Sequence, residues 1–322
     1  MRNMQKANKK LTFRILINIL KDTVRGFSED NVTRLSASLA YATLFSIIPF
    51  LSFLIIIGTF FHVDLGNQLY TQLQPILGAE VVEQLKGIME NAEKTSSSTF
   101  TAIVSLGVTI FGATAIFAEI QGSLNTVWGI KPVPKKGWLK YIKNRLLSFS
   151  IILVFAFILL MTFVITNVIR HLSNRLMFNY PDVATSFIKI IGIILNIGVT
   201  TFIFMLIFKM LPDAKIRYRD VFVGAMITTI LFLIGQWAIS FYIGMANIKS
   251  VYGVAAFIII ILTWIYYSAI IIYIGAEFTQ AWANKMGGKI FPDKYAVATK
   301  VVEIHENNPE ELSGTIETEK KI

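Results

Sequence analysis

The chain alternates between long uncharged apolar stretches and shorter segments that carry nearly all of its charges. A helix needs about 20 apolar residues to cross a hydrocarbon core of about 30 Å, and buried helices of soluble proteins rarely stay uncharged for that long. The pattern therefore predicts an all-α, polytopic membrane protein with six transmembrane helices. The uncharged stretches are Leu35–Phe61, Thr95–Ala118, Leu146–Ile169, Ile190–Phe208, Val221–Ile248 and Ser250–Ala276.

Three regions follow from this pattern. Residues 1–34 are expected to form a basic, amphipathic cytoplasmic segment, residues 35–283 the transmembrane domain, and residues 284–322 a cytoplasmic tail that is disordered from about residue 303. Within the domain, the spans are expected at about residues 35–61, 98–120, 146–169, 188–210, 221–245 and 253–278.

The segment before the first span predicts an amphipathic helix. Its apolar residues recur at helical spacing with basic residues between them, namely Phe13, Leu16, Ile17, Leu20, Val24 and Phe27. Two interpretations stay open for this helix. It lies as an interfacial helix on the cytoplasmic leaflet, or it packs on the cytoplasmic ends of the bundle.

The placement of Lys and Arg predicts the orientation. Such residues near membrane ends are retained on the cytoplasmic side. They are concentrated before the first span, after the second, after the fourth and after the sixth. The opposite side holds Lys86, Lys94, Arg170, Arg175, Lys189 and Lys249. Both termini are therefore expected in the cytoplasm, as six spans require.

Composition narrows the partners and the chemistry. The net charge of +10 is interpreted as a topology signal and as an attraction to anionic lipid headgroups at the cytoplasmic face, so no nucleic-acid partner is expected. A homo-oligomer and envelope partner proteins stay open. The chain has no cysteine, which excludes a disulfide framework, a thiolate metal site and a cysteine nucleophile.

Polar residues within the spans are candidates either for helix packing or for a substrate pathway. Small residues share one face of the fifth span at Gly224, Thr228 and Gly235, and packing is the preferred interpretation of such faces. Pro49 is expected to kink the first span. The substrate-pathway candidates are Tyr41, Ser46, Pro49, Glu119, Asn125, Asn196, Gln236, Tyr242, Tyr252, Gly253, Tyr266 and Glu277.

The two carboxylates in this set lie at the cytoplasmic ends of spans. Carboxylates near hydrocarbon usually face the bundle interior or water, and at a helix C-terminus the dipole disfavours them. Glu119 and Glu277 are therefore expected to have a compensating cation, with Lys143, Arg145 and Arg219 as candidates. A structural ion pair and a proton or substrate site are both open.

An ordered set of short motifs resembles the YihY/BrkB family of membrane proteins, long labelled "ribonuclease BN". The resemblance covers about Phe27 to Ala283. The motifs are Leu39-Ala40-Tyr41 with Ser46 and Pro49, Gly122-Ser123-Leu124-Asn125 with Trp128, Leu211-Pro212, Gly224-Ala225, Tyr252-Gly253, Leu262-Thr263-Trp264-Ile265-Tyr266 and Gly275-Ala276-Glu277. The resemblance implies a six-span protein of the bacterial inner membrane, from a family linked to envelope integrity, serum resistance and lipid or lipopolysaccharide export.

The ribonuclease label does not fit the residues. A metal-dependent nuclease needs clustered His and carboxylate ligands, whereas His62 and His171 are expected outside and His305 in the tail. We therefore expect a non-enzyme without catalytic residues, metal or cofactor.

Two function classes fit the sequence. A transporter or flippase of a lipid-like or other amphiphilic envelope substrate fits the broken spans, polar faces and end carboxylates, and it is the preferred interpretation. The alternative is a non-transporting scaffold for envelope machinery, which fits the basic N-terminal helix, the acidic tail and the absence of a midplane charge. A channel is a weaker third possibility.

Overall fold

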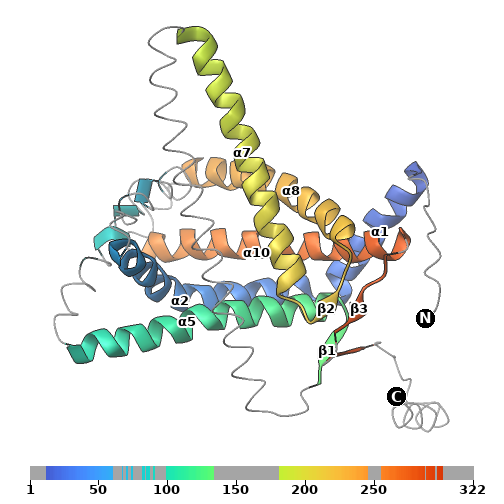
Figure 1. Cartoon of the computed structure of the whole chain (residues 1–322), viewed down its shortest axis with the longest axis horizontal. Helices are drawn as coiled ribbons and strands as arrows, with labels where there is room; N and C mark the ends of the chain where they lie inside the picture. Colours follow the sequence, from blue (N-terminus) through green and yellow to red (C-terminus); the bar gives the residue numbers. More distant parts are fainter. Residues whose placement is uncertain are drawn as a thin grey trace.

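The computed structural model (Figure 1) describes residues 12–60, 99–133, 181–245, 255–286, 288–293 and 296–299, and scattered positions between 67 and 90. For parts of these helices only the backbone is described. The third expected span, residues 146–169, and the predicted disordered tail lie outside the described residues.

The described part of the chain is mostly helical. Its six long helices are α1 (Phe13–Glu29), α2 (Val32–Phe60), α5 (Thr99–Val127), α7 (Pro181–Met210), α8 (Tyr218–Met245) and α10 (Ala255–Lys285). The last five fall on the first, second, fourth, fifth and sixth expected spans. The helix continues through Pro49 in α2, and the predicted kink there is not tested.

Three of the described helices are long and apolar enough to cross a membrane. They contain the segments Ile190–Met210, Tyr218–Ile239 and Ile258–Lys285, with mean hydropathies of 2.5, 1.9 and 2.2. Only one sixth to one third of each segment is buried within the protein, which suits helices whose outer faces meet lipid rather than water.

The helices share one end, at which α5, α7 and α10 finish and α2 and α8 begin (Figure 1). We call it the inner end. Helix α2 packs against α5 and α10, α8 packs against α10, and α7 against α8, while α1 lies against the final turns of α10. The largest buried apolar cluster also sits at this end and includes Trp128, Phe208 and Tyr273.

Short strands at the inner end amend the all-α prediction. β1 (Ile130–Pro132) pairs antiparallel with β4 (Ala296–Ala298), and β2 (Ala214–Lys215) with β3 (Phe291–Pro292). The segments leaving α5, α7 and α10 run alongside one another there, so their backbone N–H and C=O groups satisfy each other. Strand formation extends the ordered structure into the first part of the expected tail.

A reciprocal glycine–threonine contact joins α8 to α10. A Cβ atom added at Gly224 would overlap the Thr279 side chain, and one added at Gly275 would overlap Thr228. Each threonine hydroxyl donates to the carbonyl of the glycine four residues earlier in its own helix, at 2.7 Å for Thr228 and 2.6 Å for Thr279. The packing interpretation of the Gly224–Thr228 face is confirmed.

Candidate functional site: a carboxyl pair at the inner end

Glu277 lies inside the bundle, near the end of α10. Its side chain is 2% exposed, and its Oε1 atom has no hydrogen-bond partner among the described residues. The carboxyl group rests against the Cα atom of Gly26 in α1, where an added Cβ would come within 2.7 Å of the Glu277 Cδ. Gly26 is therefore the position that leaves room for this carboxyl group.

The nearest titratable partner of Glu277 is a second acid. The Glu277 carboxyl group lies within interaction range of the Asp30 carboxyl, and Glu29 is the next charge that acts on both groups. Two carboxyl groups share a hydrogen bond only when one proton lies between them. A cation partner such as Arg219 was expected, but the described partner is an acid; Lys143 and Arg145 lie outside the described residues. The described surroundings of Glu277 therefore present a second acid rather than a cation.

Burial raises the pKa of the Asp30 carboxyl above its ordinary value, and the negative charge of Glu29 raises it further. The Glu277 carboxyl acts in the opposite direction, because a hydrogen bond donated to Asp30 favours its ionised form.

A tight turn between α1 and α2 positions Asp30. Asp30 follows the last residue of α1, and Asn31 adopts a φ of 51°, a left-handed conformation that asparagine tolerates better than most residues. The Asp30 N–H donates to the Gly26 carbonyl at 2.9 Å. The turn thus holds the Asp30 carboxyl beside Gly26 and Glu277.

Helix α1 is fastened along α10 by further contacts. Ile19 is fully buried in a cluster with Phe278 and Ala281, and the Lys285 ammonium lies 2.9 Å from the Asp22 carboxylate. The amphipathic pattern explains this docking because it places apolar side chains on the bundle side of α1. Helix α1 therefore packs on the bundle at the inner end.

Other polar groups lie within the bundle near this pair. One turn before Glu277, the fully buried Tyr273 hydroxyl lies beside the Ser123 hydroxyl, with no well-formed hydrogen bond between them. Glu119 is close enough to act on Tyr273 and is half-buried. The Ser36 hydroxyl of α2 is buried without a partner in the described region. Unpaired buried polar atoms of this kind are typical sites for internal water.

Asn125 belongs to a different cluster, which fastens the loop after α7. Its side-chain amide donates to the Asp213 carboxylate at 3.0 Å, and its carbonyl accepts the Asp213 N–H at 2.9 Å. Trp128 donates its indole N–H to the Ala276 carbonyl at 3.1 Å. The Gly-Ser-Leu-Asn segment therefore stabilises the inner end next to Glu277. The prediction that Asn125 lies in a substrate pathway is not tested.

Replacing Asn125 with alanine is expected to lower the free energy of unfolding by about 2 kcal/mol, because both hydrogen bonds between Asn125 and Asp213 would be lost and the Asp213 carboxylate would keep only the longer one from the Gln121 amide, at 3.3 Å. The measurement is thermal unfolding of purified protein in detergent. Thr126→Ala is the matched control, since the exposed Thr126 hydroxyl bonds only to the Gly122 carbonyl of its own helix. Equal melting temperatures for both variants would contradict the stabilising role.

The remaining pathway candidates do not converge on Glu277. Tyr41 is 65% exposed, and Asn196 is exposed on α7. Ser46 is buried against Gly112 of α5, 3.3 Å from a Cβ added there. Gln236 and Tyr266 are half-buried. The side chains of Pro49 and Tyr242, and all of Tyr252 and Gly253, lie outside the described residues.

Asp30, Gly26 and Asp213 were not predicted from the sequence. Asp30 lies in a basic segment at the boundary between two helical patterns, where an acidic residue is normally interpreted as a solvent-exposed helix end. Its position directly before the first span, at the expected depth of the membrane surface, is the signal that could have identified it as a site residue. Among the described residues, no group of three or more His, Asp or Glu side chains is placed to hold a metal ion.

Comparisons with known proteins agree with the motif pattern. The family model described as "Virulence factor BrkB" matches residues 23–297. A UPF0761 membrane protein of Psychromonas ingrahamii is 27% identical over 278 residues, covering 84% of this chain and 88% of the relative. One of Cronobacter sakazakii is 24% identical over 258 residues, covering 78% and 83%. One of Haemophilus influenzae is 25% identical over 260 residues, covering 78% and 90%. No solved structure matches the chain.

Proposed function

The chain belongs to the Virulence factor BrkB family of membrane proteins, and from this premise we propose that it moves a lipid-like or other amphiphilic envelope substrate across the bacterial inner membrane, using the proton of the Asp30–Glu277 pair as coupling ion. In this proposal the chain spans the membrane six times, has both termini in the cytoplasm and performs no covalent chemistry.

The path of the chain supports six spans. Helix α5 ends at the inner end, whereas α7 begins away from it and runs back towards it (Figure 1). In the proposed topology one further crossing is needed between these two helices. The uncharged residues 146–169 supply enough length for one crossing.

The observation that carries the proposal is the Asp30–Glu277 pair, in which Glu277 is buried and Asp30 is half-buried. An ionisable group inside a membrane protein is costly and usually marks a substrate, ion or proton pathway. A purely structural contact between α1 and α10 needs no acid, because apolar or amide side chains would fill the space without titrating. The buried Tyr273 and Ser123 hydroxyls, one turn from Glu277 on α10 and on α5, have no hydrogen-bond partner among the described residues, and Glu119 is close enough to act on Tyr273.

Loss of the shared proton supplies a driving force for movement. With the proton bound, the two carboxyl groups attract each other and hold the α1–α2 turn against α10. Without it, two negative charges face each other in a poorly solvated site and repel. We expect the turn to move away and the inner end to open, which provides one half of an alternating-access cycle.

The direct test is a lipid-translocation assay. Purified protein is reconstituted into vesicles containing a fluorescently labelled phospholipid. An impermeant quencher is added outside, and the fluorescence that is lost as labelled lipid moves from the inner to the outer leaflet is followed over time. We expect faster translocation than in protein-free vesicles, and a rate that changes when a pH difference is imposed. Protein-containing vesicles that match empty ones for this and other amphiphilic probes would contradict the transport function.

A scaffold without transport is the second candidate. It is favoured by the outward positions of Tyr41 and Asn196, which do not line a common cavity with Glu277. The same assay separates the two functions, because a scaffold gives no translocation at any pH.

The topology is tested by single cysteines in the naturally cysteine-free chain. Cysteine is placed at Lys86, expected outside, or at Lys215, which lies in β2 with its side chain 61% exposed. An impermeant maleimide is expected to label Lys86→Cys in intact spheroplasts, and Lys215→Cys only after lysis. The reverse pattern would overturn the proposed orientation.

A further inference from the structure

Helix α1 presents three different surfaces in angular order, at 100° per residue. The first faces the bundle and contains Ile15 and Ile19, packed on Phe278 and Val223. The second is an exposed apolar stripe. The third is basic. Such an order suits a helix that touches protein, hydrocarbon and headgroups at the same time.

The apolar stripe consists of residues 13, 17, 20 and 24, spaced by four, three and four positions. Phe13 is 77% exposed, Ile17 38%, Leu20 51% and Val24 68%. Clusters of large apolar side chains facing water are unusual in proteins and mark contact surfaces. We call these four residues the α1 stripe.

Cations flank the stripe, and acids lie beyond them. Lys21, Arg14 and Arg25 follow directly around the helix, whereas Glu29 and Asp22 lie on the far side, next to the bundle-facing surface. Asp22 is paired with Lys285 of α10, and Glu29 with Arg25 at 2.7 Å. Arg14 and Lys21 form no ion pair with any described residue. The edge of the stripe is thus positively charged.

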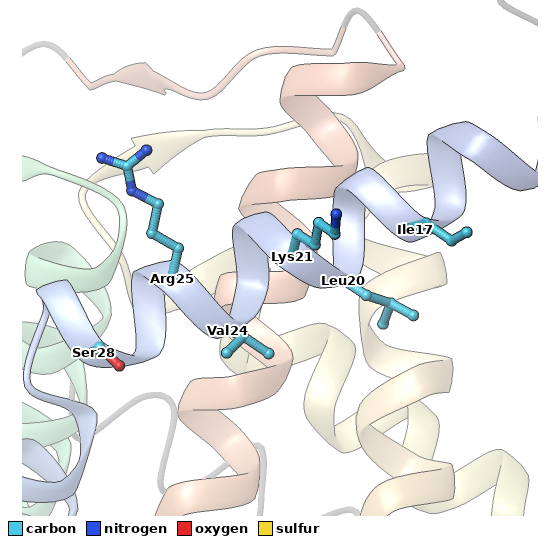
Figure 2. A pocket seen from close by; sticks show the side chains of 6 residues that line it. All are labelled: Ile17, Leu20, Lys21, Val24, Arg25 and Ser28. Carbon is cyan, nitrogen blue, oxygen red and sulfur yellow. The ribbon is translucent and has the colours of Figure 1, made fainter.

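A groove lies where the stripe meets this basic edge. It has a volume of about 490 Å³ and is lined by Ile17, Leu20, Lys21, Val24, Arg25 and Ser28. Figure 2 shows Leu20 and Val24 pointing to one side of α1, while Lys21 and Arg25 point to the other. Apolar and cationic sides are therefore separated across a single surface.

We propose that this surface of α1 binds anionic phospholipid of the cytoplasmic leaflet. Acyl chains contact the α1 stripe, and the headgroup phosphate is held by Lys21 and Arg25 with the Ser28 hydroxyl beside them. The proposal rests on the proposed orientation, which places the inner end in the cytoplasm, but it does not require transport.

Continuity with the bundle favours lipid over a protein partner. The bundle-facing side of α1 packs beside Val223 and Ile227 of α8, and the adjacent positions of α8 are exposed and apolar, with Phe222 at 48%, Met226 at 38% and Ile230 at 48%. The α1 stripe therefore extends a surface that already faces the bilayer. Cations at such a depth attract anionic leaflets.

Depth is tested with an apolar fluorophore on single cysteines. Leu20→Cys lies in the α1 stripe, and Asn18→Cys lies on the polar side of the same helix. The labelled proteins are reconstituted into vesicles of phosphatidylcholine and phosphatidylglycerol that carry acyl-chain quenchers. We expect quenching at position 20 to be several-fold stronger than at position 18. Equal quenching would overturn the proposal, and so would a disulfide between two copies at position 20, which would identify a second chain as the occupant.

Headgroup selectivity is tested by thermal unfolding in mild detergent. Phosphatidylglycerol is expected to raise the melting temperature of the wild-type protein, whereas phosphatidylcholine and inorganic phosphate have little effect. The double variant Lys21→Gln/Arg25→Gln is expected to bind phosphatidylglycerol about tenfold more weakly or worse. Lys215→Gln, which removes an exposed cation elsewhere at the inner end, is the control. Equal stabilisation by both phospholipids, or by free phosphate, would contradict anionic lipid binding. Neither readout depends on translocation, so failure here leaves the transport proposal to its own assay.

Discussion

Gly275→Leu is expected to separate α8 from α10 and to lower the free energy of unfolding by about 3 kcal/mol. The new side chain would occupy the space of Thr228, whose β-branched side chain cannot rotate away freely because its hydroxyl is bonded at 2.7 Å within its own helix. Thr279 and Gly224 form the reciprocal contact one turn away, so the displacement would spread along the interface.

The measurement is thermal unfolding of purified protein, with Gly192→Leu as control. Nothing lies within 4 Å of a Cβ added at Gly192, and this exposed position of α7 should accept an apolar side chain. The smaller change Gly275→Ala is expected to be partly rescued by Thr228→Gly, because the two substitutions act on one contact. Additive effects, or a Gly275→Leu protein as stable as the Gly192→Leu control, would refute the interlocked packing.

Glu277→Gln is expected to remove most of the pH dependence of both stability and transport. The glutamine amide donates to ionised Asp30 without needing a proton, while the shape of the side chain is kept. Expression and stability at neutral pH should therefore stay near wild type. Translocation should fall and no longer respond to a pH difference, because the site cannot release a proton.

The direction of the stability change follows from Asp30. In the unfolded chain this carboxyl titrates near its ordinary pKa of about 3.9, whereas burial raises its pKa in the folded protein. The folded state therefore holds the proton more strongly, and wild-type stability falls as pH rises from about 4 through the folded pKa. Melting curves over this range should slope downwards for the wild type and stay nearly flat for Glu277→Gln.

Glu83→Gln is the control for this experiment, since Glu83 is an exposed acid that does not act on either carboxyl group of the pair. A Glu277→Gln protein that unfolds, or one whose stability and transport follow the wild-type pH profile, would count against a titrating pair.

The sequence singles out Glu277 as a candidate but gives no sign of Asp30. Glu277 stands out because a carboxylate ends a long apolar span, and such a group has to find a partner. Its partner Asp30 is distant in the chain, and a single sequence carries no information about which distant side chains meet. The placement of basic residues also predicted a cation partner, since an ion pair is the commoner solution, whereas the described neighbour is a second acid.

Packing faces were easier to predict than partners. The Gly224–Thr228 face follows from helical spacing, whereas its fit against Gly275 and Thr279 depends on the relative shift of two helices, which periodicity does not fix. Polar residues were placed less reliably. A polar residue within an apolar span suggests an interior position, yet Tyr41 and Asn196 are both exposed. The short strands were missed because segments of two or three residues carry no period.

The most direct measurement is the infrared absorption of protonated carboxyl groups in the purified protein. At neutral pH the wild type should show a band from a protonated carboxyl group that is absent in Glu277→Gln and unchanged in the control Glu83→Gln, and this band should vanish when the pH is raised far enough to ionise the pair. Identical spectra for wild type and Glu277→Gln at neutral pH would show that Asp30 and Glu277 share no proton.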